Sequence, residues 1–363
     1  MAQKEVRVPE KTLREFTRQV FSRCGLPEAD AATEADCLLW ANLRGVDSHG
    51  VLRIPGYVER AKDGSMNVKP NIVVLKETPA VMFVDADSAF GPVVTVWAMR
   101  KVIEKAKKIG IGWCLIKNTT HQGALGYYAL MAAREGMAGI AFVCSPPNMA
   151  PYGARTSGVH NSPIAIAVPG KVHRPLILDM ATSVAAGGKL SLAIDKGVPI
   201  PLGWALDKDG KPTTDPKNAP VLLPFGSYKG SGLAMMFECL SGVMAGNALQ
   251  EPALHGRLAK GGRGAPGTPG ARMAQVQNGV VAAIDISLFT DVEKYKETID
   301  SYIEGIKALP TAEGSSEVMV PGEPEDRVYD DRSKNGIPLP LGTLQNLKQV
   351  AERLEMEFPF KLA

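Results

Sequence analysis

The sequence predicts an α/β fold in which helices cover a sheet and a helical segment comes first. Apolar residues recur at helical spacing near the N-terminus, and strand-like and helix-like segments alternate from residue 81 onward. The 363 residues, 45% of them hydrophobic and 22% charged, are typical of a globular chain with two or three lobes. Such a chain is long enough to enclose a small ligand.

Two helices are expected before the first strand. In the first, over residues 10–25, the apolar residues at helical spacing are Leu13, Phe16, Val20 and Phe21. The second helix, over 31–44, ends at Gly45. The polar sequence DSHGVLR follows at 47–53, so the end of a helix would hold this turn in place.

The rest of the chain alternates between strands and helices. Strands are expected at 81–87, 111–116, 139–144, 164–168, 176–179 and 279–286. Helices are expected at 92–108, after residue 123, at 184–196, at 230–246 and at 344–358. The segment 251–270 is dense in Gly, Pro and basic residues, which predicts a surface loop.

Composition excludes several classes of partner. The net charge of +3 is spread along the whole chain without a basic block, which argues against nucleic acid. No window approaches the ~20 apolar residues that span a bilayer, and the first residues lack the apolar stretch of a secretory signal, so we expect no membrane insertion. Five widely spaced cysteines, mostly in apolar runs, predict reduced core thiols and a cytoplasmic protein: Cys24, Cys37, Cys114, Cys144 and Cys239.

The common nucleotide-binding and metal-binding motifs are either absent from the sequence or lack the structural context that they need. The one G-x-G-x-x-G match lies at 262–267, where no strand precedes it and two prolines interrupt the helix that it should open. Neither a P-loop nor G-x-S-x-G occurs. The five histidines never fall at i, i+4 and no cysteine pair has zinc spacing, so we expect no catalytic metal.

The turn at 47–53 combines two residue types that suit a 2-oxo acid. His49 can exchange a proton near neutral pH, and the planar guanidinium of Arg53 matches a carboxylate. Ser48 can orient a ring or a substrate. A histidine in a polar turn is more often a helix cap or a solvated residue, and that alternative stays open.

Three further polar clusters follow strands or open helices. His121 lies in NTTHQG, between an apolar strand and a helix, where open α/β sheets present ligands. The strand end at 179–183 reads Asp179, Met180, Ala181, Thr182 and Ser183, and its free amides can hold a phosphate or a ribose. Lys229 and Gly230 lie on a glycine-rich turn suited to a pyrophosphate. Helix caps and a plain surface turn remain the alternatives.

Together these segments resemble the malate/L-lactate dehydrogenase family of the second type. That family also includes sulfolactate, ureidoglycolate and diketogulonate dehydrogenases and some cyclic imine reductases. The resemblance covers about residues 13–325. Its most specific pieces are DSHGVLR, THQG at 120–123, LDMATS at 178–183, IPLGWALDKDGKPTTDP at 200–216 and YKGSGLA at 228–234.

The resemblance implies a mixed-sheet, non-Rossmann nicotinamide-binding fold of the sulfolactate/malate dehydrogenase type, and a homodimer. Residues 1–78 would form a helical lobe that carries substrate residues. Residues 79–339 would form the α/β lobe that binds the cofactor, and a helix within 340–363 would pack on the first lobe. NAD or NADP is the implied cofactor, and a small anionic 2-hydroxy or 2-oxo acid is the implied substrate.

Roles can be carried over position by position. His49 resembles the proton donor to the substrate oxygen, and Ser48 lies beside it. Arg53 resembles the residue that binds the substrate carboxylate. His121 resembles a second group that faces both substrate and nicotinamide. The expected cofactor contacts are His121, Asp179, Met180, Ala181, Thr182, Ser183, Lys229, Gly230, Pro321, Gly322 and Glu323.

Some positions depart from the family pattern. The imine-reducing branch completes a Ser-His-Asp relay with an aspartate in the region where this chain has Lys189, so a C=O substrate is favoured over C=N. His160-Asn161-Ser162-Pro163 replaces T-N-P, and Ser227 and Tyr228 replace a simpler glycine pair. Basic residues of a loop near the expected pocket rim suit an anionic group or simple solvation: Arg257, Lys260, Arg263 and Arg272.

We therefore expect an oxidoreductase that moves a hydride between NAD(P) and a small acid such as malate, lactate or sulfolactate. The first alternative is an NADPH-dependent reductase of a cyclic imine 2-carboxylate. The second is a binding protein without catalysis, against which the presence of His49, Arg53 and His121 argues.

Overall fold

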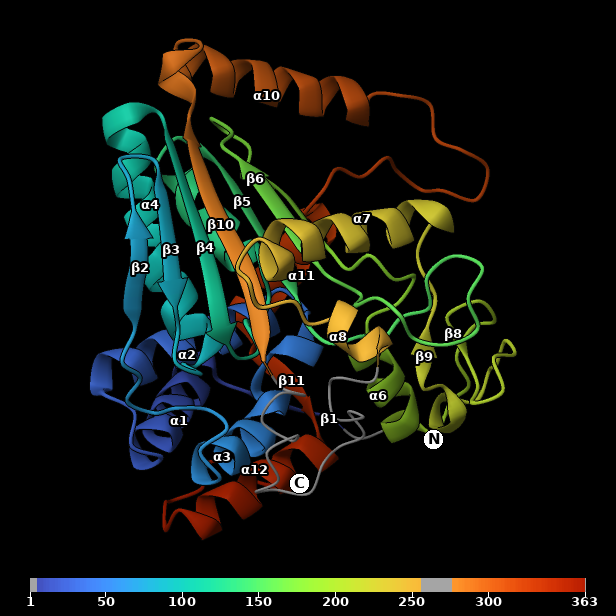
Figure 1. Cartoon of the computed structure of the whole chain (residues 1–363). Helices are drawn as coiled ribbons and strands as arrows, with labels where there is room; N and C mark the ends of the chain where they lie inside the picture. The colour runs from blue at the N-terminus through green and yellow to red at the C-terminus, as the bar shows by residue number, and fades with distance from the viewer. Residues whose placement is uncertain (1–4, 256–275, 363) are drawn as a thin grey trace.

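The computed structural model describes residues 5–255 and 276–362, and the structural statements below concern those residues (Figure 1). Seven strands form one mixed sheet in the order β2-β3-β4-β10-β5-β6-β7. They are β2 (Val73–Glu77), β3 (Val81–Asp85), β4 (Ile111–Thr119), β10 (Gln277–Asp285), β5 (Met137–Cys144), β6 (Ile164–Val168) and β7 (Leu176–Met180). Only β3 and β4 pair in parallel. Strand β10 returns from far along the chain and lies between β4 and β5, so the sheet is not doubly wound.

The two faces of the sheet are covered by different helices. On β5, Ala141 and Val143 face a core that includes α4 (Gly91–Ile109) and α5 (Gly126–Arg134). The intervening Phe142 points to the opposite face, because side chains alternate along a strand. There its ring stacks on Phe237 with centroids 4.9 Å apart. Phe237 belongs to α7 (Tyr228–Glu238), which lies in front of the sheet in Figure 1.

A second core joins both ends of the chain, below the sheet in Figure 1. It is shared by α1 (Glu10–Arg23), α2 (Glu28–Leu43), α3 (Ile54–Lys62) and α12 (Leu341–Arg353). Two phenylalanines near the C-terminus pack edge-on against Phe16 of α1, with centroids 5.9 and 5.6 Å away. Strand β1 (Glu5–Val8) pairs with β11 (Ile337–Pro340). The last residues therefore pack on the N-terminal helices.

The remaining elements surround these two cores. The helices are α6 (Gly187–Lys196), α8 (Glu251–Leu254), α10 (Val292–Lys307) and α11 (Glu323–Asn335). The short strands β8 (Ala205–Leu206) and β9 (Val221–Leu222) pair with each other. The 3₁₀ turns are η1 (Asp47–His49), η2 (Val51–Arg53), η3 (Pro216–Asn218) and η5 (Ile286–Leu288), and η4 (Cys239–Val243) is a π-helix that continues α7.

Several elements differ from the sequence-based expectation. The helix expected at 230–246 begins earlier and ends in the π-helix, and the one at 184–196 begins later. Helices α10 and α11 were not expected from the sequence; α11 is strongly polar and buries none of its side chains, and α10 buries only Asp300 and Ile303. The segment expected as a loop at 251–270 starts with α8, and its rest, with the basic residues and the rejected glycine motif, lies outside the described residues.

Two composition-based expectations can be compared with the structure. None of the described helices combines the length and the apolar composition of a bilayer span. All five cysteines are free thiols. Three of them are buried, but Cys24 is half-buried and Cys239 is exposed, so the expectation that the cysteines are core residues holds only in part.

Glu34 of α2 is an unusual core residue. None of its surface is exposed, and neither carboxylate oxygen has a hydrogen-bond partner among the described residues. Burial raises the pKa of Glu34 to about 8, because the charged form loses its hydration. A carboxyl whose pKa is raised by folding holds its proton more tightly in the folded state. The contribution of this tightly held proton to the free energy of unfolding is complete below the ordinary pKa of 4.5. It is lost as the pH rises through 8.

Replacing Glu34 by Gln should remove this pH dependence. Between about pH 5 and 8 we expect the free energy of unfolding of the wild type to fall by up to about 1.4 kcal/mol per pH unit relative to Glu34→Gln. Urea unfolding of both proteins at several pH values measures this difference. Parallel stability curves would show that Glu34 keeps an ordinary pKa in the fold.

Candidate active site

The turn that carries His49 is fixed from two sides. Asn42, near the end of α2, donates from Nδ2 to Asp47 at 2.7 Å and accepts from the Val51 N–H at 2.8 Å. Gly50 lies so close to Asn42 that an added Cβ would be 2.1 Å from its Oδ1, so a side chain cannot fit there. Arg332 of α11 donates to both carboxylate oxygens of Asp47, at 2.6 and 3.0 Å. The polar turn is therefore a rigid part of the fold.

His49 contacts two other predicted site residues. Its Nδ1 lies 2.9 Å from Ser48 Oγ. Its ring stacks on that of His121, with centroids 5.3 Å apart and planes 27° apart. Ser48 packs against the start of α6, where a Cβ on Gly188 would lie 2.3 Å from the Ser48 Cβ. Two turns more than 70 residues apart in the sequence thus present their histidines together.

The tautomer of His121 follows from its partner. Tyr57 Oη, buried in α3, lies 2.5 Å from His121 Nδ1. Burial raises the pKa of Tyr57, so the phenol keeps its proton and donates it to the ring. Nδ1 of His121 is then the acceptor, and its Nε2 carries the hydrogen. Tyr57 is not among the site residues expected from the sequence, although it follows Arg53 by four residues, the spacing of one helical face.

Both histidines are neutral at neutral pH. Burial, followed by the positive charge of Arg53, lowers the pKa of His49 to about 3. Burial lowers the pKa of His121 as well, with further contributions from Arg53, His49, Arg60 and His160. Each ring can therefore donate or accept one hydrogen bond without carrying a charge. A bound anion would offset the nearby cations and raise both pKa values.

Among the described residues, Arg53 has a hydrogen-bond partner only at Nε. Its Nε donates to the backbone carbonyl of Ser48 at 2.6 Å. Within the described part of the chain its two Nη groups make no hydrogen bond or ion pair, so the guanidinium fork is open. An open fork beside two neutral imidazoles is a suitable receptor for a carboxylate that carries a reactive oxygen next to it.

The predicted cofactor segments meet beside this group. Asp179, at the end of β7, accepts a hydrogen bond from the N–H of Gly126 at 2.7 Å, five residues after His121. Loss of hydration among the surrounding protein atoms raises the pKa of Asp179 to about 6. Thr182 O accepts from the Phe225 N–H at 3.0 Å, and a Cβ on Gly230 would be 2.3 Å from the same oxygen. Residues 179–183 and the start of α7 are therefore adjacent.

The side chains of these segments differ in availability. Lys229 is exposed at the start of α7, and Met180 and Ala181 are half-buried. Ser183 Oγ donates to the Ala185 carbonyl at 2.7 Å. The hydroxyl of Thr182 is buried without a partner in the described structure. An orphaned hydroxyl within residues 179–183 and an exposed lysine at the adjoining start of α7 fit the polar groups of a dinucleotide.

The third predicted cofactor segment lies along β7. Pro321 O accepts from the Ile177 N–H at 3.4 Å, and Gly322, with φ of 88°, is the N-cap residue of α11. Glu323 instead accepts from Lys307 Nζ at 2.5 Å. Hydrogen bonds from Lys307 and from an arginine of α11 lower its pKa to about 2. The Glu323 carboxylate is thus already paired.

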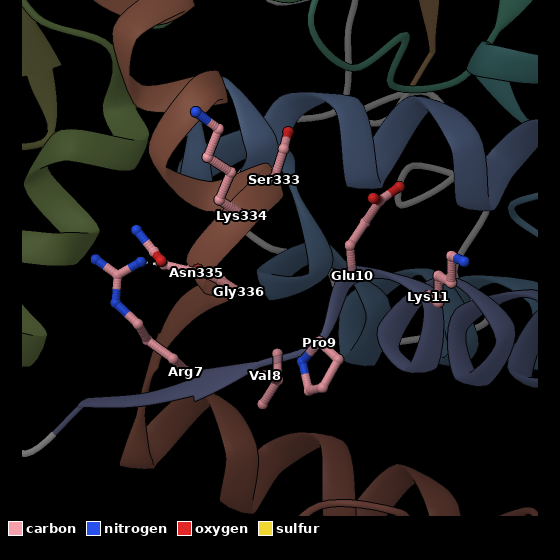
Figure 2. A pocket seen from close by; sticks show the side chains of 9 residues that line it. All are labelled: Arg7, Val8, Pro9, Glu10, Lys11, Ser333, Lys334, Asn335 and Gly336. Carbon is pink, nitrogen blue, oxygen red and sulfur yellow. Dashed lines mark hydrogen bonds between the residues drawn. The ribbon is translucent and has the colours of Figure 1, made fainter.

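A groove of about 380 Å³ lies where β1 meets the end of α11 (Figure 2). Arg7, Lys11 and Lys334 are among its lining residues. None of the predicted site residues lines it, so it is separate from the histidine pair. In the described residues no three His, Cys, Asp or Glu side chains form a metal-binding group, and the expectation of no catalytic metal stays a prediction.

A sequence profile described as malate/L-lactate dehydrogenase matches residues 8–348. The chain belongs to the malate/L-lactate dehydrogenase family. It is 37% identical over 362 residues to a malate dehydrogenase of Pyrococcus horikoshii, covering 97% of this chain and 96% of that one. This membership confirms the family predicted from the sequence motifs.

Solved structures of similar proteins share the fold. The sulfolactate dehydrogenase of Methanocaldococcus jannaschii has a TM-score of 0.83 at 34% identity, covering 97% of this chain and 98% of that one. A Δ1-piperideine-2-carboxylate reductase from Pseudomonas syringae pv. tomato has a TM-score of 0.81 at 26% identity, covering 95% of this chain and 100% of that one. The predicted mixed-sheet, non-Rossmann fold is confirmed.

Proposed function

We propose that this chain transfers a hydride between NAD(P) and the 2-position of a small anionic 2-hydroxy or 2-oxo acid. Family membership bears out the prediction of a hydroxy-acid oxidoreductase. The observation that carries the assignment to this site is the open fork of Arg53 next to the stacked rings of His49 and His121. This arrangement offers a carboxylate receptor and a proton carrier within reach of one small molecule.

A nicotinamide cofactor, when bound, supplies the hydride donor or acceptor. It would be held by residues 179–183 and by Lys229 and Gly230, with Pro321 and Gly322 along the neighbouring strand. Arg53 binds the substrate carboxylate through its two free Nη groups and thereby fixes the 2-oxygen beside the imidazoles.

The proton moves between the 2-oxygen and His49. In the oxidative direction the neutral ring accepts the hydroxyl proton, and Ser48 holds its Nδ1. His121 donates from Nε2 to the same oxygen, because Tyr57 occupies its Nδ1. When substrate binds, its carboxylate offsets the positive field of Arg53 and raises the pKa of His49 from its low value, toward the range that suits proton exchange.

The imine-reductase alternative is less well supported. Lys189, in the region where the imine-reducing branch has an aspartate, is exposed, and its ammonium lies 5.9 Å from the centre of the Trp204 ring. No carboxylate of the described residues hydrogen-bonds to Ser48 or His49, so a Ser-His-Asp relay is not formed there.

Nicotinamide absorbance with a panel of acids tests this assignment. We expect reduction of NAD or NADP with at least one of malate, lactate and sulfolactate, and little turnover with cyclic imine 2-carboxylates. A clear preference for imines would contradict the proposed hydroxy-acid dehydrogenase and favour a cyclic imine 2-carboxylate reductase. The same panel decides between NAD and NADP.

We also propose a homodimer that uses the outer face of α7 and η4. Large apolar side chains are exposed on this face: Leu233, Met235, Met236, Leu240, Val243 and Met244. Exposed apolar side chains clustered along one helical segment favour a contact with another chain. Light scattering should give about twice the mass of 38.7 kDa; a monomer at micromolar concentration would contradict the dimer.

Two expectations from the sequence remain part of the proposal. The division into a helical lobe, 1–78, and an α/β lobe, 79–339, with 340–363 on the first, is supported by the core that joins the N-terminal helices to α12, although α2 also contributes side chains to the core of the sheet. A cytoplasmic location is supported by the five free thiols.

A further inference from the structure

His160 is a third buried or half-buried histidine, and the mechanism above leaves it unused. It lies between β5 and β6 and is only 8% exposed. Its Nδ1 lies 3.3 Å from Ser162 Oγ. Nε2 has no hydrogen-bond partner among the described residues, yet it is not one of the fully covered polar atoms. One ring nitrogen of a nearly buried histidine is thus open to an incoming group.

The surrounding hydrogen bonds decide which tautomer His160 adopts. The Gln250 amide donates to Cys144 Sγ at 2.8 Å, and Ser162 Oγ donates to the same sulfur at 3.4 Å. With its own hydrogen used in that way, Ser162 must accept from His160 Nδ1–H. His160 is neutral, because burial lowers its pKa to about 3. Its Nε2 therefore presents a lone pair and accepts a hydrogen bond rather than an anion.

Two observations place His160 beside the cofactor segments. His160 is one of the groups that lower the pKa of His121. The next residue, Asn161, accepts from the Thr182 N–H at 3.1 Å through its carbonyl. Thr182 is the residue whose hydroxyl is buried without a partner. His160 thus lies within electrostatic range of His121, and the residue after it is hydrogen-bonded to the proposed dinucleotide segment.

We propose that His160 Nε2 accepts a hydrogen bond from the carboxamide N–H of the nicotinamide ring. This inference rests on the proposed function, because it assumes that the cofactor binds at residues 179–183. The carboxamide is the N–H donor that lies next to the reacting carbon of the cofactor. An acceptor fixed by Ser162 would set the orientation of the ring and the face that it presents to the substrate.

Binding of a cofactor analogue tests this contact without turnover. In 3-acetylpyridine adenine dinucleotide, a methyl ketone replaces the carboxamide, so the N–H donor is missing. We expect the wild type to bind this analogue about tenfold more weakly than the natural cofactor, measured by calorimetry with NAD or NADP and the matching analogue. Equal affinities in the wild type would overturn the proposal.

Two variants of His160 separate this role from a structural one. His160→Asn keeps a donor near the position of Nδ1, for Ser162, and removes the acceptor at Nε2. His160→Gln keeps an acceptor near Nε2 and loses the Ser162 bond. We expect the discrimination between cofactor and analogue to vanish in His160→Asn and to persist in His160→Gln. The opposite pattern would show that only the Ser162 bond matters.

The outcome also distinguishes this inference from the proposed function. If the wild type oxidises a hydroxy acid but His160→Asn discriminates as well as the wild type, only the role of His160 is wrong. If the wild type neither binds nor reduces a nicotinamide cofactor, the function itself fails, and the inference fails with it.

Discussion

Replacing His49 by Ala should lower kcat by about 10²- to 10⁴-fold while leaving cofactor affinity nearly unchanged. The substitution removes the ring that exchanges a proton with the substrate oxygen and that stacks on His121 at 5.3 Å. The turn should keep its shape, because Asn42 and Arg332 hold it through Asp47 and the Val51 amide. Steady-state kinetics and calorimetric cofactor binding provide the two readouts.

His173 offers a matched control for this substitution. It is half-exposed, and its charged neighbour is Glu304 at 3.6 Å. His173→Ala should retain wild-type kcat. Unchanged turnover in His49→Ala would remove His49 from the mechanism and leave His121 as the proton carrier.

Arg53→Lys should raise KM for the acid by roughly 10²-fold, with a smaller loss in kcat. A lysine places one point charge where the guanidinium offers two parallel N–H groups, and it loses the 2.6 Å hydrogen bond to Ser48 O. Arg23→Lys is the matched control, because Arg23 is exposed at the end of α1. If KM and kcat in Arg53→Lys match the wild type, Arg53 does not bind the carboxylate.

Local sequence patterns were sufficient for much of the fold. The buried strands β4, β5 and β10 are continuous apolar runs, and α1 and α4 carry apolar stripes, so their periodicity is visible in the sequence. Helix α11 buries none of its side chains and is held by ion pairs such as that of Arg332 with Asp47. Those partners are far apart in the sequence, so no local window contains them.

The candidate site was predictable where its residues form compact motifs. DSHGVLR and THQG each place a histidine in a polar turn, and the structure brings these two turns into contact. The contact of Tyr57 with His121 spans 64 residues and depends on how α3 packs, so spacing alone could not reveal it. The open nitrogen of His160 is visible only once Ser162 and Cys144 are placed around it.

The central claim is that one site transfers hydride from the 2-carbon of a hydroxy acid to a nicotinamide. The direct measurement uses a hydroxy acid deuterated at its 2-carbon, with NMR of the reduced cofactor after turnover. We predict one deuterium at C4 of the nicotinamide, on a single face of the ring, since a fixed site presents only one face. A reduced cofactor without deuterium, or no reduced cofactor with any 2-hydroxy acid tested, would contradict the account.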